Sequence, residues 1–410
     1  MRDLLVAVRE SNSFQRSRLG CFIDPNAPLS SLPLTTKSEI AEDQRRNPPF
    51  GSNRTYSLPE YTRFSQTSGS TGPPIRWLDT TDSWRALVEC WQRIYRVAGI
   101  GRNDAVFFAF SFGPFLGFWT AYDAAIAEGA LCLPGGGMSS SARVQCIMDA
   151  RATVLCCTPT YAIRLGETAR EHGLDLSESA IRAILVAGEP GGSIPSVRAK
   201  IETLWPGARV WDHHGMTEVG PVSCECPVRA GILHVFEDAH LPEILDPETQ
   251  RPVVPGEAGE LVLTTLKRVA SPLIRYRTGD LVRSEPQDGP CACGSCELSL
   301  VGGILGRVDD MVVVRGVNLY PSAVDRILSE FAAVAEYRVE LSRVNAMDEV
   351  RLTIEPLPGH GEVNTLRESV ATALRNAFQL RIEVSAVEPG SLPRFEMKAR
   401  RWVRLPDETG

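Results

Sequence analysis

Between residues 83 and 211, short apolar runs alternate with segments in which apolar residues recur at every third or fourth position. The apolar runs predict buried strands, at 105–110, 130–133, 154–157, 183–187 and 209–211. The periodic segments predict helices, at 83–97, 140–150, 161–171 and 195–204. This alternation is typical of a parallel α/β sheet, whose ligands bind beyond the carboxyl ends of the strands. Polar and glycine-rich residues follow several of these runs, so we expect the functional site at that edge.

The pattern changes after residue 220, where short strands and turns replace the alternation. Strands are predicted at 260–265 and 272–276, and a polar turn at 306–310 is a candidate hinge. Beyond the turn, the pattern predicts two helices and three strands, at 321–331, 336–341, 349–355, 366–378 and 381–387. We therefore predict an α/β fold of two domains, a large N-terminal domain over 1–306 and a small α+β domain over 307–410. The basic tail at 393–401 is expected to be mobile.

Composition excludes several classes of protein. The chain has 410 residues, of which 43% are hydrophobic and 23% charged, as in ordinary globular proteins. A net charge of −7 gives no electrostatic support for a nucleic-acid partner. No run approaches ~18 uncharged apolar residues, and the charged amino terminus does not resemble a signal peptide. We expect a cytoplasmic protein without a membrane partner, whose eleven cysteines are reduced thiols, metal ligands or core residues.

A polar stretch, Ser68-Gly69-Ser70-Thr71-Gly72, precedes Pro73-Pro74. Glycines let backbone N–H groups approach an anion, and hydroxyls add further donors. The stretch therefore suits a phosphate-binding loop, although a polar surface loop would have the same composition. It is not a Walker loop, because no Gly-Lys-Ser/Thr follows the glycines.

Five sequence blocks, in order, carry a resemblance to a known family. They are 67–73, 212–218, 276–280, 306–310 continuing into 315–318, and 393–400. Together they resemble the core motifs of the adenylate-forming superfamily, and most closely its phenylacetate–CoA ligase branch, whose early segment residues 32–37 also resemble. The resemblance implies a large domain with parallel and mixed sheets, a small mobile domain, and a reaction in which a carboxylate attacks the α-phosphorus of ATP.

The resemblance also implies roles for residues in these blocks. Thr217 would contact phosphate and Glu218 would hold Mg²⁺, while Lys398 would reach the carboxylate and the α-phosphate from the small domain. The nucleotide would be bound by the phosphate loop, the adenine pocket and the ribose contacts: Ser68, Gly69, Ser70, Thr71, Gly72, Gly188, Glu189, Pro190, Asp212, His213, His214, Asp280 and Arg307. In isolation, Lys398 would be interpreted as part of a solvated basic tail.

Three positions depart from the family pattern. Pro73 stands where many relatives carry lysine, so the loop would grip phosphate mainly through N–H and hydroxyl donors. His214 replaces the usual aromatic residue, and its imidazole could stack on adenine or on the acyl group. Met397 precedes Lys398 where other branches have glycine.

Cysteines cluster in the 222–300 region. The branch includes members whose matching positions, Cys226, His234, Cys291 and Cys293, resemble a zinc site, with Cys224 and Cys296 as alternates. Four such ligands would close a tetrahedral Zn²⁺ site and leave no position for water, so the zinc would be structural. Free thiols in loops are the alternative, because the Cys-x-Cys spacing is tighter than the usual one.

The expected function is ATP-dependent activation of a carboxylic acid to an acyl-adenylate, followed by transfer to coenzyme A. The aromatic stretch at 112–119 favours an aromatic or arylacetic acid, although core packing would explain it equally. Alternatively, the adenylate passes to a carrier protein or to a non-thiol nucleophile such as an amine or nitrite. A non-catalytic nucleotide-binding homologue is the alternative from another class, but Glu218, Asp280 and Lys398 together argue against it. A dimer is plausible.

Overall fold

The computed structural model describes residues 1–20, 24, 26, 28–67, 73–286, 289–314, 317–344, 347–395 and 399–405. The predicted phosphate-loop residues Ser68, Gly69, Ser70, Thr71 and Gly72, and the predicted catalytic Lys398, lie outside these residues.

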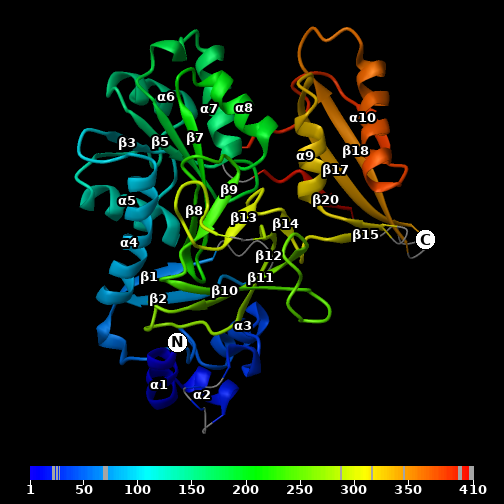
Figure 1. Ribbon diagram of the computed structural model, residues 1–410. Coiled ribbons are helices and arrows are strands. Elements are labelled where there is room, and N and C mark those ends of the chain that lie inside the picture. Colours follow the sequence, from blue (N-terminus) through cyan, green and yellow to red (C-terminus); the bar gives the residue numbers. More distant parts are fainter. Residues whose placement is uncertain are drawn as a thin grey trace.

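An eight-stranded sheet forms the centre of the large N-terminal part (Figure 1). Its order is β13 (Ser299–Val301), β9 (Ile232–Val235), β8 (Gly220–Glu225), β7 (Arg209–Met216), β6 (Ala183–Val186), β5 (Val154–Cys157), β3 (Ala105–Phe108) and β4 (Leu131–Pro134). The five strands from β7 to β4 are parallel, which confirms the predicted parallel sheet. The other three pair antiparallel.

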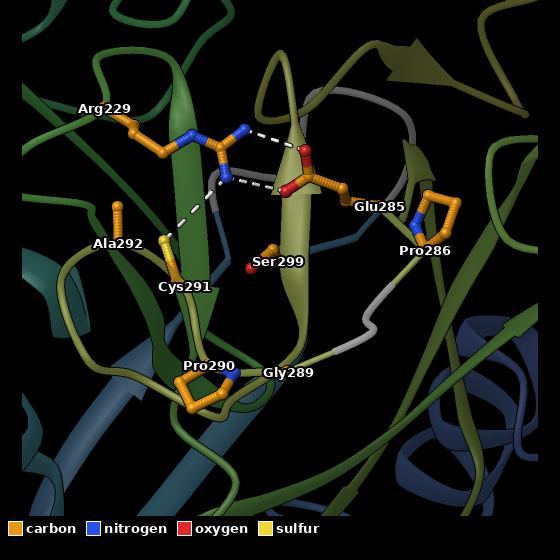
Figure 2. Close-up of a pocket in the computed structure, with 8 residues that line it drawn as sticks. All are labelled: Arg229, Glu285, Pro286, Gly289, Pro290, Cys291, Ala292 and Ser299. Atoms are coloured by element: carbon orange, nitrogen blue, oxygen red, sulfur yellow. Dashed lines mark hydrogen bonds and ion pairs between the residues drawn. The ribbon is translucent and has the colours of Figure 1, made fainter.

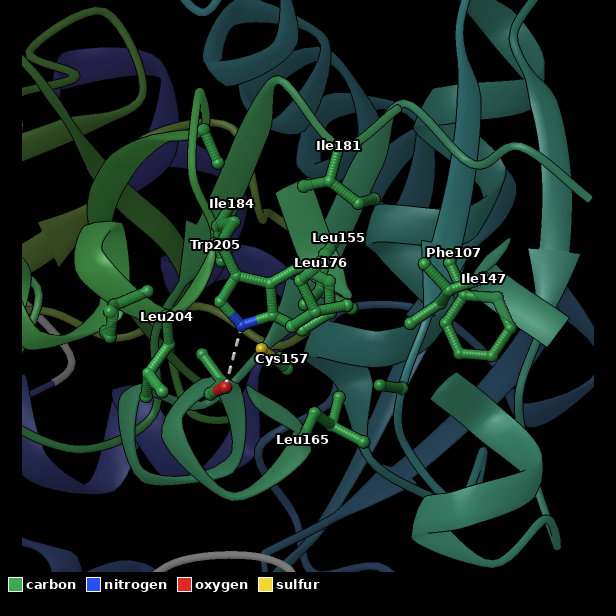
Figure 3. Packing of buried hydrophobic residues seen from close by; sticks show 14 of the residues in the cluster. Phe107, Ile147, Leu155, Cys157, Leu165, Leu176, Ile181, Ile184, Leu204 and Trp205 are labelled. Carbon is green, nitrogen blue, oxygen red and sulfur yellow. Dashed lines mark hydrogen bonds between the residues drawn. The ribbon is translucent and has the colours of Figure 1, made fainter. Parts of the chain in front are cut away.

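Helices cover both faces of this sheet because its strands are apolar on both sides. The helices are α4 (Thr81–Val97), α5 (Leu116–Ala127), α6 (Ser140–Asp149), α7 (Pro159–Glu171) and α8 (Pro195–Leu204). Alternate residues of one strand enter different cores: Phe107 packs with α6, α7 and α8, whereas Phe108 packs with α4 and α5. Figure 3 shows the first core, in which the indole N–H of Trp205 donates to the carbonyl of Ala162 at 2.9 Å.

Two sequence-based strand boundaries are wrong. The strand predicted to end at residue 211 continues to Met216, so most of the 212–218 block lies on β7 and pairs with β8. Residues 272–275 are not a strand, because Arg275 has a positive φ of 48° and its guanidinium is bound by Glu243 at 2.8 Å. The strand begins at Tyr276 and contains the 276–280 block.

A second sheet and the N-terminal helices complete the large part. The sheet order is β10 (His240–Leu245), β11 (Ala258–Thr265), β12 (Tyr276–Arg283) and β14 (Gly306–Arg307), and a separate hairpin joins β1 (Tyr61–Gln66) to β2 (Arg76–Thr80). The helices are α1 (Arg2–Ser11), α2 (Ser13–Leu19) and α3 (Lys37–Arg46), with short 3₁₀ turns at η1 (Leu29–Ser31), η2 (Leu58–Glu60) and η3 (Leu176–Glu178).

The C-terminal part has a hydrophobic core of its own. It contains β15 (Val312–Val314), β16 (Val317–Leu319), α9 (Pro321–Ser329), β17 (Val334–Val344), β18 (Met347–Pro356), α10 (Val363–Phe378), β19 (Glu383–Ala386) and β20 (Trp402–Arg404). Helices α9 and α10 pack on a sheet of order β19-β18-β17-β20, which matches the predicted α+β unit. Strand β20 pairs in parallel with β17, so residues 402–404 are held on the sheet. No helix among the described residues is long and apolar enough to cross a membrane.

Candidate active site

Asp280 joins three sequence blocks that are far apart in the chain. Its Oδ2 lies 2.8 Å from Nε2 of His214, and its Oδ1 accepts a hydrogen bond from the Arg307 guanidinium at 2.9 Å. The fold dictates this contact, because Asp280 on β12 and Arg307 on β14 are register partners. Arg307 also donates two hydrogen bonds to Asp309, at 2.8 and 2.9 Å. The structure thus brings together His214, Asp280 and Arg307, three residues that the resemblance assigns to nucleotide binding, and the contact of His214 with Asp280 was not predicted.

Glu218 lies in the turn between β7 and β8, and its side chain is only 8% exposed. Its Oε1 lies 3.4 Å from the ammonium of Lys37, the first residue of α3. The backbone carbonyls of Thr217 and Glu218 both accept from Arg268, whose guanidinium forms a buried ion pair with Asp79. The buried Arg268 therefore binds the backbone of this turn, while the Glu218 carboxylate faces the Lys37 ammonium.

Lys37 contacts the predicted site residue Glu218 and was not itself predicted as a site residue. The chain has four lysines, and Lys37 lies in the 32–37 segment that resembles the branch. The rarity of lysine in this chain and the position of Lys37 in that segment are the features that could have identified it. Its contact with Glu218, 181 positions away, depends on the packing of α3 and could not be predicted from the sequence.

The predicted adenine-pocket residues differ in what their side chains contact. Glu189 is partly buried, and its carboxylate accepts the backbone N–H of Thr160 at 2.8 Å and that of Ala399 at 3.2 Å. Asp212 is buried and accepts from the hydroxyl of Ser193 at 2.5 Å. Burial raises the pKa of Asp212 to about 7. Both carboxylates are thus occupied by protein groups, whereas Gly188 and Pro190 are exposed. Their roles in adenine binding stay predictions.

The two adjacent histidines face opposite sides of β7, as successive residues of a strand do. His213 packs edge-on against Trp91, with ring centroids 4.4 Å apart. Burial lowers its pKa to about 3, so its ring is neutral. His213 is therefore part of the core, on the side of β7 away from Asp280, and a direct contact with nucleotide stays a prediction for it.

The aromatic stretch forms a packed cluster. Phe110 stacks on Phe118 at 4.1 Å, and Phe112 makes an edge contact with Trp119 at 5.1 Å. Phe112 has a positive φ of 52° and Trp119 is 36% exposed. The cluster thus extends from the core below β3 to the surface, and its use as an acid pocket stays a prediction.

The predicted zinc ligands meet in the structure. The ligand atoms of Cys226, His234, Cys291 and Cys293 all lie within 4.8 Å of one another. The sulfurs of Cys226 and Cys291 are 3.8 Å apart, and the sulfur of Cys293 is 3.3 Å from Nε2 of His234. Zn–S bonds of about 2.3 Å at tetrahedral angles place sulfurs about 3.8 Å apart, so the donor set fits this ion.

The alternative zinc ligands, Cys224 and Cys296, lie outside this group. Cys224 is buried in the core with Phe236, and Cys296 is exposed. A cavity of about 310 Å³ adjoins the cluster, where Arg229 donates to Glu285 and to the sulfur of Cys291 (Figure 2). This cavity lies beside the cysteines rather than at Asp280.

Comparisons with known proteins identify the family. The model of the AMP-binding enzymes matches residues 63–267, and that of the AMP-binding enzyme C-terminal domain matches 316–405. The phenylacetate-coenzyme A ligase of Thermus thermophilus is 30% identical, over 99% of this chain and 95% of that protein. The chain belongs to the AMP-binding enzyme family. The same ligase of Escherichia coli is 31% identical to this AMP-binding enzyme, over 93% of the chain and 86% of that protein.

Solved structures agree with this membership. A 2-hydroxyisobutyryl-CoA ligase in the postadenylation state, bound to 2-HIB-AMP, is 29% identical with a TM-score of 0.91, over 98% of this chain and 87% of that one. The same ligase in the thioesterification state gives a TM-score of 0.69, over 99% and 90%. The predicted superfamily, its phenylacetate–CoA ligase branch, the fold class and the class of enzyme, an AMP-forming acid–thiol ligase, are confirmed.

Proposed function

We propose that this AMP-binding enzyme converts an aromatic or arylacetic acid to its CoA thioester in two steps. The acid carboxylate attacks the α-phosphorus of ATP, and pyrophosphate leaves. The CoA thiol then attacks the acyl carbon, and AMP leaves. The observation that carries the proposal is the contact of Asp280 with both His214 and Arg307, in a chain that is 30% and 31% identical to two phenylacetate-coenzyme A ligases.

The nucleotide would lie against the carboxyl ends of the parallel strands. The Asp280 carboxylate would accept from the ribose hydroxyls, with Arg307 holding the carboxylate in place. The loop Ser68–Gly72 would cradle the β- and γ-phosphates through its N–H and hydroxyl donors.

Glu218 would hold Mg²⁺ beside Thr217. Its carboxylate already faces a cation, the Lys37 ammonium at 3.4 Å, and a carboxylate oxygen is a ligand that Mg²⁺ prefers. When bound, this ion would neutralise charge on the phosphates. Arg268 would keep the turn in register by binding both backbone carbonyls.

Lys398 would contact the acid carboxylate and the α-phosphate from a small domain over 307–410. A compact ammonium on a flexible stem suits such bridging. The small domain would then rotate near Asp309 to admit CoA. The TM-scores support this proposal, because the present arrangement is closer to the postadenylation state of the 2-hydroxyisobutyryl-CoA ligase than to its thioesterification state.

One structural zinc ion per chain is part of the proposal. It would be held by Cys226, His234, Cys291 and Cys293, with His234 Nδ1 steadied by the Ser299 hydroxyl at 3.3 Å. Four protein ligands leave no position for a reacting water, so the ion would stabilise the hairpins rather than take part in the reaction.

The test is ATP–pyrophosphate exchange with phenylacetate, benzoate and their ring-substituted analogues, with and without CoA, and with products identified by mass. An acid that supports both exchange and a CoA thioester is the expected result. Exchange without thioester would favour a carrier protein or a non-thiol nucleophile as acceptor. Absence of exchange with every acid would favour a non-catalytic homologue, and unchanged exchange in Lys398→Ala would refute the role of that lysine.

A further inference from the structure

Glu189 lies in the turn after β6, and its carboxylate accepts hydrogen bonds from two backbone N–H groups. One oxygen accepts from Thr160 in the first turn of α7, at 2.8 Å. The other accepts from Ala399 of the C-terminal part, at 3.2 Å. A carboxylate at a helix N-terminus is favourably placed, so α7 fixes the first oxygen and thereby orients the second.

Ala399 directly follows Lys398 in the sequence. The segment around it is otherwise held by groups of its own part of the molecule. Before it, the buried Glu355 binds Arg394 and accepts the N–H groups of Gly390 and Leu392, at 2.9 and 2.8 Å. These anchors would move together with the C-terminal part and cannot by themselves fix its orientation.

The residues that follow Ala399 in the sequence are also bound within the C-terminal part. Arg401 pairs with Glu336 at 2.6 Å, and the next residues form β20 on the C-terminal sheet. The hydrogen bond from Ala399 to Glu189 differs from these anchors because its acceptor belongs to the central sheet. It therefore exists only in one orientation of the two parts.

We propose that Glu189 is a positioning residue for adenylation: its carboxylate docks the backbone after Lys398 and so fixes where that lysine acts. The inference rests on the proposed function. It predicts that Glu189 stabilises the adenylation arrangement and contributes little once the acyl-adenylate has formed, because the two parts must then separate from this orientation.

Glu189→Gln tests the inference, since the two N–H groups bind different oxygens of the carboxylate and the amide replaces one of these oxygens by an NH₂ donor. The probes are phenylacetate or benzoate, whichever gives faster ATP–pyrophosphate exchange with the unaltered protein, and the corresponding synthetic acyl-adenylate with CoA. Loss of a charge-assisted hydrogen bond should lower kcat for exchange roughly ten-fold or more. The KM for ATP and the rate of thioester formation from the adenylate should each stay within about two-fold.

Thr158→Ala is the matched control. The Thr158 hydroxyl caps the same helix by accepting from the N–H of Tyr161 at 3.2 Å, but it does not contact Ala399. If Glu189 served only α7, both variants would change the two half-reactions in equal proportion.

Three outcomes contradict the inference. Unchanged exchange in Glu189→Gln would show that the contact does not matter. Equal loss in both half-reactions, or a large rise in KM for ATP, would assign Glu189 to the nucleotide pocket or to folding. Absence of exchange in the unaltered protein would overturn the proposed function itself, and the inference with it.

Discussion

Single residues in this enzyme acquire their chemistry from partners that are distant in sequence. Glu218 illustrates this, because its carboxylate is nearly buried and yet faces the ammonium of Lys37. Pro73 leaves the proposed phosphate loop without a lysine of its own. A lysine from α3 is therefore available where phosphate and its metal ion would lie.

We expect Lys37→Ala to weaken ATP binding. Removal of one ammonium from the proposed phosphate site should raise the KM for ATP in exchange roughly ten-fold or more, because a hydrogen bond to a charged group contributes about 1.5 to 3 kcal/mol and about 1.4 kcal/mol is a factor of ten. The kcat should change much less. Lys200→Ala is the control, since Lys200 makes a similar surface pair with Glu167 at 3.5 Å. An unchanged KM in Lys37→Ala would show that Lys37 only neutralises Glu218.

Asp325 on α9 makes stability depend on pH. Burial raises its pKa to about 7; Arg401 opposes this shift, and Glu189 and Glu336 add to it. The folded chain therefore keeps a proton that the unfolded chain releases above about pH 4, and stability falls as pH rises from there to about 7.

Asp325→Asn should remove this dependence, because the amide cannot ionise and can still accept from the Tyr337 hydroxyl. Its stability relative to the unaltered protein should rise by about 2 kcal/mol between pH 5 and pH 8, measured by thermal denaturation at each pH. Asp82→Asn, at a side chain that is 88% exposed, should show no such trend. An equal effect of Asp325→Asn at both pH values would contradict the shift.

Elements were predicted well where one periodicity dominated. Strand β5 and helix α8 have the predicted bounds, because a fully buried strand and an amphipathic helix are set by local pattern. The ends of β7 and β12 were misjudged, since polar residues such as Asp212 and Asp280 continue those strands and are bound by Ser193 and His214.

The same distinction holds for the candidate site, where residues in sequence motifs could be predicted and long-range contacts could not. The resemblance located Asp280 and Arg307, and the sheet register explains their contact. The contacts of Glu189 with Ala399 and of Lys37 with Glu218 were beyond prediction, because they depend on how whole elements pack. The predicted roles of Ser68–Gly72 and of Lys398 remain predictions.

The hairpin region that holds the cysteine cluster should depend on zinc. Cys293→Ser removes one of four ligands, so we expect loss of zinc from the purified protein and a lower Tm, measured by elemental analysis and thermal denaturation. Cys296→Ser should keep one zinc per chain, because Cys296 is exposed and outside the group. Zinc-free unaltered protein would contradict the site.

At the scale of the whole molecule, the proposed cycle uses two arrangements of the same parts, one for each half-reaction. Helix α8 of the large part touches α9 of the C-terminal part, where the hydroxyl oxygens of Ser196 and Ser329 are 2.5 Å apart. This contact, like that of Glu189 with Ala399, belongs to the arrangement that matches the postadenylation state. A covalent bond between these two positions would therefore hold the molecule in it.

We expect the double variant Ser196→Cys/Ser329→Cys to form a disulfide on mild oxidation, because oxygens this close leave room for an S–S bond of about 2.05 Å with little movement. The oxidised protein should lose CoA-thioester formation by more than about ten-fold, while ATP–pyrophosphate exchange changes by less than about three-fold. Dithiothreitol should restore the thioester step. Each single cysteine variant, oxidised in the same way, controls for damage to the native cysteines. If the cross-linked protein makes thioester at the normal rate, both half-reactions run in one arrangement, and a rotation near Asp309 plays no part in the cycle.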